Sequence, residues 1–556
     1  MQLTGAEILI KCLLEQKVDT IFGFPGGTVL NIYDELYKYK DKINHVLVAH
    51  EQGAAHAADG YARSTGKVGV CLATSGPGAT NLVTGIAAAY MDSIPVVAIT
   101  GNVTMPLLGK DSFQEVDITG VTMPITKHNY IVKKIGDLAD VIREAFYIAR
   151  SGRPGPVLVD IPKDITAAKA DYEPEEPKTM EYTVDIDSIK NAAKLINSSK
   201  CPMIFSGGGI ISSGASEEPI KLAEKINAPV TTSTMGIGGF PSSHRLYTGM
   251  IGMHGTKASN LSVLKSDLLI AVGVRFSDRV ISKAEHFQER TKILHIDIDS
   301  AEIGKNVKAN SFVLGDVKTV LKELIPLIDE KKNEAWEDEV EKLKNIKTKP
   351  NSEFSNYIIK PNYFFEKLHD VTKGEALICT DVGQHQMWTA QYYDFEKPRT
   401  FISSLGLGAM GYGVGASVGV QIANPDKRVV TITGDGSFGM NCTELATIVS
   451  NNLPIIIIVM NNNSLGMVRQ WQSLFYEGRA SHTILNRKTD FVKLAEAFGA
   501  KGLRIDDKSK IEGVLKEAFE LNEPVVVDCV IEEEEKVFPM VAAGNPINKI
   551  ITEDDI

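Results

Sequence analysis

The sequence predicts an α/β protein made of three doubly wound parallel-sheet domains, and three observations support this prediction. The chain has 556 residues, more than one hydrophobic core normally supports, so its length indicates about three or four domains. Short runs rich in β-branched residues alternate with helical stretches, a pattern typical of parallel sheets covered by helices. In the first part of the chain, each of these runs leads into a turn that contains glycine, proline or asparagine.

The first domain is predicted over residues 1–165, with strands at 68–73, 95–100 and 156–161. Residues 166–187 are acidic, contain proline and show little periodicity, so we expect them to form a linker.

A second α/β domain is predicted over 188–335, with strands at 202–206, 268–272 and 293–298 and a helical stretch at 317–328. The charged segment 336–360 is predicted to be a second linker, helical until it breaks at Pro350. The third domain is expected over 361–556, with strands at 376–379, 429–433, 455–460 and 525–530.

Bulk composition disfavours two kinds of partner. The formal net charge of −11 argues against nucleic acid, because nucleic-acid binders use basic surfaces to release counterions. No apolar run approaches the ~20 residues that span a bilayer, so no membrane insertion is expected. The amino-terminal segment has helical spacing and lacks a basic leader and a cleavage site, which indicates a cytoplasmic protein.

Two polar clusters follow apolar runs in the third domain. Asp435, within Gly-Asp-Gly-Ser, follows the run 429–433, and Asn462 follows the run 455–460. Ligands of open α/β sheets bind at the carboxyl ends of such strands. Mg²⁺ takes oxygen ligands, often one or two from the protein and the rest from phosphates and water, so Asp435 and Asn462 are predicted to bind Mg²⁺ with a diphosphate. Taken alone, Gly-Asp-Gly also occurs in ordinary strand-to-helix turns.

The stretches GDGSFGMNCTELATIV and NNNSLGMVRQWQ are more specific. With the strand between them they resemble the signature of thiamine-diphosphate enzymes, and the second stretch is similar to the catalytic subunits of acetohydroxyacid (acetolactate) synthases. Two similar α/β units with a third between them also resemble this family, and the resemblance covers essentially the whole chain. It implies thiamine diphosphate, Mg²⁺ and FAD as cofactors, with a pyrimidine-binding, an FAD-binding and a diphosphate-binding domain in that order.

Glu51 opens a predicted helix after an apolar stretch. A carboxylate at a helix start is common, because the helix macrodipole favours it. In the family, however, a glutamate beside the pyrimidine ring of the cofactor shares a proton with a ring nitrogen. Such a group should lie among apolar walls, where desolvation raises its pKa. The resemblance therefore implies that Glu51 is catalytic.

Further residues are implied to contact thiamine diphosphate: Pro25, Thr74, Val382, Gly383, Gln384, His385, Met410, Gly436, Ser437, Ser464 and Met467. Gly27 is implied to face the reacting carbon, Gln114 the substrate carbonyl, and Ser464 is implied to offer its backbone carbonyl to the metal. Taken singly, glycine turns and isolated methionines also suit ordinary turns and core packing.

The middle domain is implied to bind FAD, because several polar motifs fall in order at its strand ends. The implied residues are Arg153, Gly207, Gly208, Met253, His254, Gly255, Thr256, Gly273, Arg275, Asp297, Ile298 and Asp316. A flavin diphosphate needs cationic and backbone donors of this kind. Each motif alone also suits an ordinary loop.

The resemblance implies acetolactate synthase activity, which decarboxylates pyruvate and joins the product to pyruvate or 2-ketobutyrate, in branched-chain amino-acid biosynthesis. Arg279 is implied to pair with the acceptor carboxylate, and Trp471 to form a wall against its alkyl group, although Trp471 could also be a packing residue. Pyruvate oxidase, catabolic acetolactate synthase and other thiamine-dependent decarboxylases or carboligases are the alternatives. A non-catalytic homologue would be expected to lack Glu51, Asp435 or Asn462, and all three are present.

The family also implies an assembly. Glu51 and Asp435 of one site would come from different chains, which requires a homodimer or homotetramer. A separate small regulatory subunit is implied as a further partner.

Overall fold

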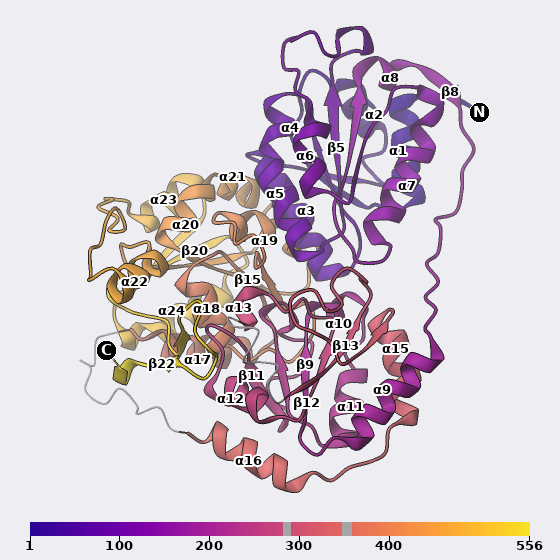
Figure 1. The fold of residues 1–556 in the computed structure, drawn as a ribbon. Helices are drawn as coiled ribbons and strands as arrows, with labels where there is room; N and C mark the ends of the chain where they lie inside the picture. Colours follow the sequence, from indigo (N-terminus) through magenta and orange to yellow (C-terminus); the bar gives the residue numbers. More distant parts are fainter. Residues whose placement is uncertain (282–290, 347–358, 556) are drawn as a thin grey trace.

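The structure, a computed structural model, describes residues 1–281, 291–346 and 359–555. It contains three six-stranded sheets in which every strand pairing is parallel. Figure 1 shows the three sheets, with their helices, as separate bodies that meet near the centre of the molecule. The predicted fold class is therefore confirmed.

The first sheet has the strand order β3-β2-β4-β5-β7-β6. Its strands are β2 (Thr20–Gly23), β3 (Asn44–Leu47), β4 (Gly69–Ala73), β5 (Val96–Asn102), β6 (His128–Ile131) and β7 (Val157–Pro162). Its helices are α1 (Gly5–Glu15), α2 (Leu30–Lys38), α3 (Glu51–Thr65), α4 (Pro77–Asn81), α5 (Val83–Asp92), α6 (Ile118–Thr122), α7 (Leu138–Arg150) and α8 (Lys163–Ala167).

The middle sheet has the order β11-β10-β9-β12-β13-β14. Its strands are β9 (Pro202–Ser206), β10 (Val230–Thr232), β11 (Tyr247–Met250), β12 (Leu268–Val272), β13 (Lys292–Asp297) and β14 (Ser311–Leu314). Its helices are α9 (Ile186–Ser198), α10 (Gly208–Ser212), α11 (Glu218–Ile226), α12 (Lys257–Lys265), α13 (Asp278–Ile281) and α15 (Val317–Leu324).

The third sheet has the order β16-β15-β17-β18-β20-β19. Its strands are β15 (Leu377–Thr380), β16 (Phe401–Ser403), β17 (Val429–Gly434), β18 (Ile456–Asn461), β19 (Lys501–Ile505) and β20 (Val525–Val530). Its helices are α17 (Pro361–Thr372), α18 (Gln384–Tyr392), α19 (Tyr412–Ala423), α20 (Asp435–Asn441), α21 (Leu445–Ser450), α22 (Gly466–Phe475), α23 (Phe491–Phe498) and α24 (Ile511–Glu520).

The segments between the sheets are only partly irregular. β8 (Lys169–Asp171) pairs antiparallel with β1 (Gln2–Thr4), and residues 172–185 then run without regular structure along the outside of the molecule to α9. Before the third sheet, α16 (Glu334–Lys344) forms a helix, whereas the break predicted at Pro350 lies outside the described residues. No helix in the described ranges has the length and apolarity needed to cross a bilayer.

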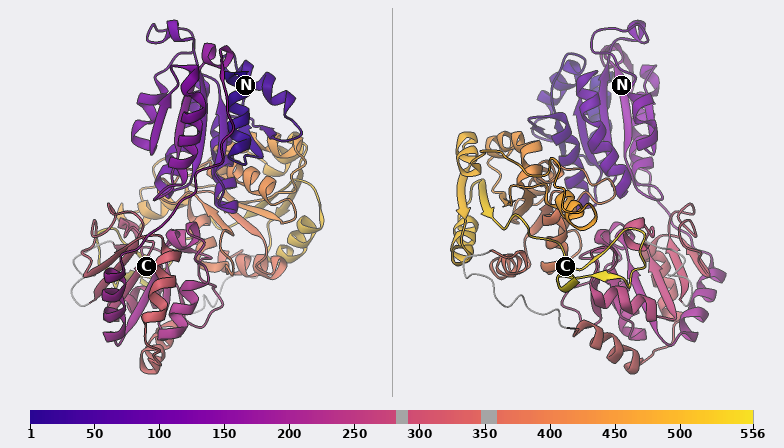
Figure 2. Two further views of the ribbon diagram at one scale, coloured as in Figure 1. Left: turned by 90° about the vertical axis from the view of Figure 1, so that its right-hand side faces the viewer. Right: turned by 60° about the vertical axis from the view of Figure 1, so that its left-hand side comes forward.

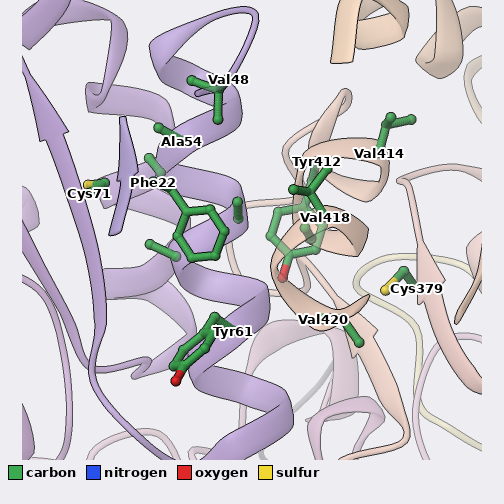
Figure 3. Packing of buried hydrophobic residues seen from close by; sticks show 14 of the residues in the cluster. Phe22, Val48, Ala54, Tyr61, Cys71, Cys379, Tyr412, Val414, Val418 and Val420 are labelled. Atoms are coloured by element: carbon green, nitrogen blue, oxygen red, sulfur yellow. The ribbon is translucent and has the colours of Figure 1, made fainter. Parts of the chain in front are cut away.

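The first and third units pack together through α3 and α19. One hydrophobic cluster contains Phe22 and Tyr61 from the first unit and Tyr412 and Val418 from the third (Figure 3). Along this contact a Cβ atom on Gly60 would overlap the backbone of Ala416, so glycine is what lets the two helix backbones approach so closely. Figure 2 shows the same contact between the first and third units from two further directions.

Candidate active site

Asp435 and Asn462 are neighbours at the carboxyl edge of the third sheet. The Asp435 carboxyl faces the backbone amides of Gly436, Asn463 and Ser464, and the Ser464 amide also donates to Asn462 Oδ1 at 3.2 Å. Both side chains are buried, and burial raises the pKa of Asp435 to about 6 although the amides oppose this shift. An acidic and an amide oxygen thus lie side by side, with Ser464 next to both.

The segment 382–385 lies at the end of the adjacent strand β15 and reaches this pair. The Ser437 hydroxyl donates to the Val382 carbonyl at 3.2 Å, and Asn462 Nδ2 donates to Gln384 Oε1 at 3.3 Å. His385 is buried, and burial lowers its pKa to about 3, which keeps the imidazole neutral. Within the described ranges its Nε2 atom is buried without a hydrogen-bond partner, so this edge can still bond one more polar group. Gly383, with φ at 153°, precedes α18.

Met410 is held close to the Gly-Asp-Gly-Ser turn. A Cβ atom on Gly436 would lie 3.9 Å from Met410 Cε and 2.6 Å from Leu465 Cδ2. The loop that carries Met410 is fixed by Asp381, whose carboxylate accepts from the backbone amide of Gly411 at 2.9 Å. Met467 lies on α22, half-buried against the core of the third sheet.

Glu51 and Thr74 come together at the carboxyl edge of the first sheet. Glu51 is half-buried at the start of α3, and Asn81 Nδ2 donates to its Oε2 atom at 2.9 Å. A Cβ atom on Gly78 would lie 3.2 Å from Glu51 Oε1 and 2.8 Å from Thr74 Cγ2. Thr74 is itself hydrogen-bonded to the Thr28 hydroxyl at 2.9 Å.

The glycine turn beside this group is open on one side. Pro25 and Gly27 are exposed, and a Cβ atom on Gly27 would have no neighbour within 4 Å. Gln114 has φ of 57°, and its backbone would lie 2.8 Å from a Cβ atom on Gly76. The predicted residues Pro25, Gly27, Glu51, Thr74 and Gln114 therefore cluster at one end of the first unit.

The predicted residues around Glu51 (the Glu51 group) and those around Asp435, Asn462 and Ser464 (the Asp435 group) lie apart within one chain. In the described part of the chain, no hydrogen bond or ion pair joins a member of one group to a member of the other. One polar contact between the two units does reach the start of α3: the Glu444 carboxylate accepts from the backbone amides of Ala49 and His50, just before Glu51.

A cavity of about 430 Å³ lies where the three units meet. Seven of the residues expected to bind FAD line it: Arg153, Gly208, Gly273, Arg275, Asp297, Ile298 and Asp316. The first and third units also contribute wall residues, including Arg63, Asp92 and Leu405. Its volume falls within the range of about 300–1,000 Å³ that small-molecule sites occupy.

Arg275 lines this cavity and is available to an anion. Burial lowers the pKa of its half-buried guanidinium from the ordinary value, and among the residues described it makes no hydrogen bond or ion pair. Arg153, by contrast, pairs with Glu302 at 2.9 Å and with Asp299 at 3.4 Å. Burial also raises the pKa of Asp297 to about 6. A partly desolvated, unpaired guanidinium is a favourable site for a phosphate group.

The remaining residues expected near FAD lie outside the wall of this cavity. Gly207 packs against the Gly273 backbone. Met253, His254, Gly255 and Thr256 form the turn between β11 and α12, where the Met253 amide donates to the Arg279 carbonyl at 2.8 Å.

The two residues expected to bind the acceptor substrate lie on different units. The Arg279 side chain is exposed and lies 3.7 Å from Asp278. Trp471 is half-buried on α22 and packs edge-to-face on Phe475, with ring centroids 5.3 Å apart. Their joint role in substrate binding stays a prediction.

Several residues at these sites were missed in the sequence. Asp381 and Glu444 are buried carboxylates that fix the Met410 loop and the start of α3, and Met180 and Tyr182 from the predicted linker line the cavity. Asp381 ends an apolar run just as Asp435 does, so the same pattern could have revealed it. Apolar side chains within an acidic, irregular segment could likewise have indicated a docked linker.

Comparison with known proteins identifies the family to which this chain belongs. Residues 3–121 match the N-terminal TPP binding domain of thiamine pyrophosphate enzymes, residues 189–324 the central domain, and residues 381–529 the C-terminal TPP binding domain. The chain is 47% identical to the probable acetolactate synthase large subunit of Methanocaldococcus jannaschii, over 98% of this chain and 95% of that protein. It is 44% identical to the acetolactate synthase large subunit of Haemophilus influenzae (99% and 98%) and 48% identical to the acetolactate synthase of Mycobacterium bovis (99% and 91%). The chain therefore belongs to the thiamine pyrophosphate enzymes and, among them, to the acetolactate synthase large-subunit family.

Proposed function

We propose that this chain is the catalytic subunit of an acetolactate synthase. It decarboxylates pyruvate and joins the two-carbon unit to a second 2-ketoacid, pyruvate or 2-ketobutyrate, as a step of branched-chain amino-acid biosynthesis. The observation that supports this most directly is the meeting of Asp435, Asn462 and Ser464 at the ends of β17 and β18.

The same three residues are proposed to bind Mg²⁺. Asp435 and Asn462 supply side-chain oxygens, and Ser464 supplies its backbone carbonyl. Mg²⁺ prefers such ligands and completes its coordination with phosphate oxygens and water. The diphosphate is bound by the backbone around Gly383 and Gly436 and by the side chains of Gln384, His385 and Ser437. The unpartnered Nε2 atom of His385 supports this assignment.

Thiamine diphosphate, when bound, supplies the carbon nucleophile and the electron sink that decarboxylation of a 2-ketoacid requires. Glu51 holds a proton at the pyrimidine ring, a role that suits a half-buried carboxylate oriented by Asn81. Met410 and Met467 support the pyrimidine, and Pro25 and Thr74 complete its surroundings. Gly27 and Gln114 border the space in which the substrate reacts.

Carboligation requires that the acceptor ketoacid is oriented and that water is kept away. Arg279 is proposed to pair with the acceptor carboxylate, because a guanidinium matches the geometry of that group. Trp471 is proposed to contact the acceptor alkyl group.

FAD is proposed to occupy the cavity between the three units. Arg275 would pair with its diphosphate, Asp297 and Asp316 would bind its ribose or adenine, and the backbone around Gly208 and Gly273 would approach it closely. The turn 253–256 would border the same cofactor. The net reaction moves no electrons to or from a flavin, so its role here is structural.

We further propose a homodimer or homotetramer, because the Glu51 and Asp435 groups are separate within one chain. Several relatives are named large subunits, which supports a separate small regulatory subunit as partner. The enzyme is proposed to work in the cytoplasm.

The test measures acetolactate formed from pyruvate with added thiamine diphosphate and Mg²⁺, as acetoin after acid treatment. The wild-type chain should form acetolactate without oxygen uptake, and Asp435→Ala should form almost none. Asp426→Ala, at an exposed position in the turn before β17, is the matched control. Consumption of an electron acceptor in proportion to pyruvate would instead identify a pyruvate oxidase.

A further inference from the structure

Glu444 is a fully buried carboxylate between the first and third units. It ends the 3₁₀ turn Cys442–Glu444, which directly follows α20, the helix that begins at Asp435. A carboxylate in such a position needs several hydrogen-bond donors, because burial without them is costly.

Three donors from both units converge on Glu444. The His50 amide donates to Oε1 at 3.0 Å, the Ala49 amide donates to Oε2 at 3.3 Å, and the Thr447 hydroxyl donates to Oε2 at 2.6 Å. His50 is the N-cap residue of α3, and Glu51 is the first residue of that helix. A carboxylate can accept from three donors at its two oxygens, and Glu444 lies where the macrodipole of α3 favours a negative charge. Burial raises the pKa of Glu444, and the hydrogen bonds from Thr447, Ala49 and His50 oppose this shift.

Gly53 makes room for this carboxylate. A Cβ atom at position 53 would overlap Glu444 Oε1. Glycine within a helix is less favourable than alanine, so the first turn of α3 is less stable in itself at the place where the Glu444 carboxylate packs against it.

We propose that Glu444 is a positioning residue for Glu51, an inference that rests on the proposed function. It fixes the start of α3, and with it the Glu51 side chain, against the unit that carries the metal-binding turn. Because Glu444 follows the helix that begins at Asp435, a shift of that helix is transmitted to the start of α3. In a dimer whose sites combine Glu51 of one chain with Asp435 of the other, this contact lies between the two sites.

The first test replaces Glu444 by glutamine. The glutamine side chain would direct an N–H group at one of the donors. The hydrogen bonds to the amides of Ala49 and His50 would therefore be weakened. We expect kcat for acetolactate formation to fall about 10- to 100-fold, as displacement of a catalytic group by about 1 Å does. The KM for pyruvate and the Kd for thiamine diphosphate, from tryptophan fluorescence, should stay close to the wild-type values. Glu444→Asp, which keeps an acceptor, should recover part of kcat.

The second test reaches the same contact from the other side. Gly53→Ala should displace the carboxylate and lower kcat as Glu444→Gln does, although alanine favours the helix. Its matched control is Gly513→Ala, because Gly513 lies in α24 with no neighbour within 4 Å of a Cβ atom. The control should keep the wild-type kcat and raise the melting temperature slightly.

The outcomes separate this inference from the proposed function. A wild-type chain that forms no acetolactate removes the proposed function itself. An active wild type with unchanged kcat in both Glu444→Gln and Gly53→Ala overturns the positioning role. The positioning role is also overturned if kcat falls only in proportion to the loss of thiamine diphosphate affinity and of folded protein. A merely structural role would give that result.

Discussion

Arg63 forms an ion pair with Asp92 at 2.8 Å inside the contact between the first and third units. Arg63 also pairs with Asp59 at 2.6 Å, and the Tyr412 hydroxyl of α19 donates to Asp59. The Asp92 carboxylate accepts from the Leu405 amide at 2.9 Å. Because Arg63, Asp92 and Leu405 also line the cavity, one buried charged cluster joins two units and the proposed flavin site.

Replacement of Asp92 by alanine should destabilise the protein strongly. It leaves Arg63 with one acidic partner instead of two and leaves the Leu405 amide without its acceptor, and breaking a buried pair in this way costs about 3–5 kcal/mol. Urea unfolding followed by fluorescence measures the change. Lys516→Ala, which removes an exposed pair with Glu512 on α24, should destabilise the protein far less, because exposed ion pairs contribute little to stability. Equal losses of unfolding free energy in the two variants would show that the buried Arg63–Asp92 pair stabilises the protein no more than an exposed ion pair does.

Strand positions could be predicted closely, because buried parallel strands are short, continuous apolar runs. The predictions 202–206, 268–272 and 525–530 coincide with β9, β12 and β20. The order of the strands in each sheet could not be derived in the same way. It depends on crossovers between distant segments, and β7 inserts between β5 and β6 without a local signal.

Site residues were predictable where function requires a local pattern. Asp435 and Asn462 follow strands whose pairing brings them together, although their metal-binding role stays a prediction. Glu444 could not be found in this way. Its partners Ala49 and His50 lie far earlier in the chain, and a glutamate before a helix is ordinary in sequence. Met180 and Tyr182 were missed because a docked linker has no periodicity.

Glu51→Gln should reduce turnover while the cofactors stay bound. Glutamine keeps an oxygen that can accept from Asn81 but cannot exchange a proton, and loss of such a group costs about 10²- to 10⁴-fold in rate. Acetolactate formation gives the rate, and titration with thiamine diphosphate gives the affinity. Glu334→Gln, at an exposed position on α16, is the control. A variant with full turnover would exclude Glu51 as the catalytic acid–base group.

Trp471→Leu should reduce the preference for 2-ketobutyrate over pyruvate as acceptor. One methylene in an apolar pocket is worth about 1–3 kcal/mol, so an aromatic wall can provide a preference of about ten-fold or more. Competition between both ketoacids, with the two products separated by chromatography, measures this ratio. Phe475→Leu changes the ring that packs on Trp471 and should have a smaller effect. An unchanged product ratio in Trp471→Leu would assign this residue to packing alone.

Arg275→Met should weaken retention of FAD. The variant keeps much of the side-chain volume but removes the unpaired cation, and charge-assisted bonds to phosphate are about twice as strong as neutral ones. The ratio of flavin to protein absorbance after gel filtration measures retention, independently of activity. Arg245→Met, at an exposed position paired with Glu337, should keep the wild-type ratio. Equal flavin content in both variants would argue against Arg275 as the diphosphate ligand.

Asp160 should make stability depend on pH. It is buried on β7, where the Thr100 hydroxyl donates to Oδ1 at 2.7 Å and Asn102 Nδ2 donates to Oδ2 at 2.5 Å. Burial raises its pKa from 3.8 to about 7. Between these values the folded protein keeps a proton that the unfolded chain has released. The contribution of Asp160 to stability is therefore present at low pH and is lost as the pH rises through about 7.

Asp160→Asn should remove this dependence, because asparagine is neutral at every pH and can still accept from Asn102. Relative to the wild type, its melting temperature should be higher at pH 8, and the difference should shrink toward pH 5. Each unit of pKa shift corresponds to about 1.4 kcal/mol, so calorimetry at the two pH values can resolve the effect. Asp338→Asn, at an exposed position on α16, should show no such trend. A difference that grows toward low pH would mean that Asp160 is stabilised in its charged form, with Thr100 and Asn102 outweighing its burial.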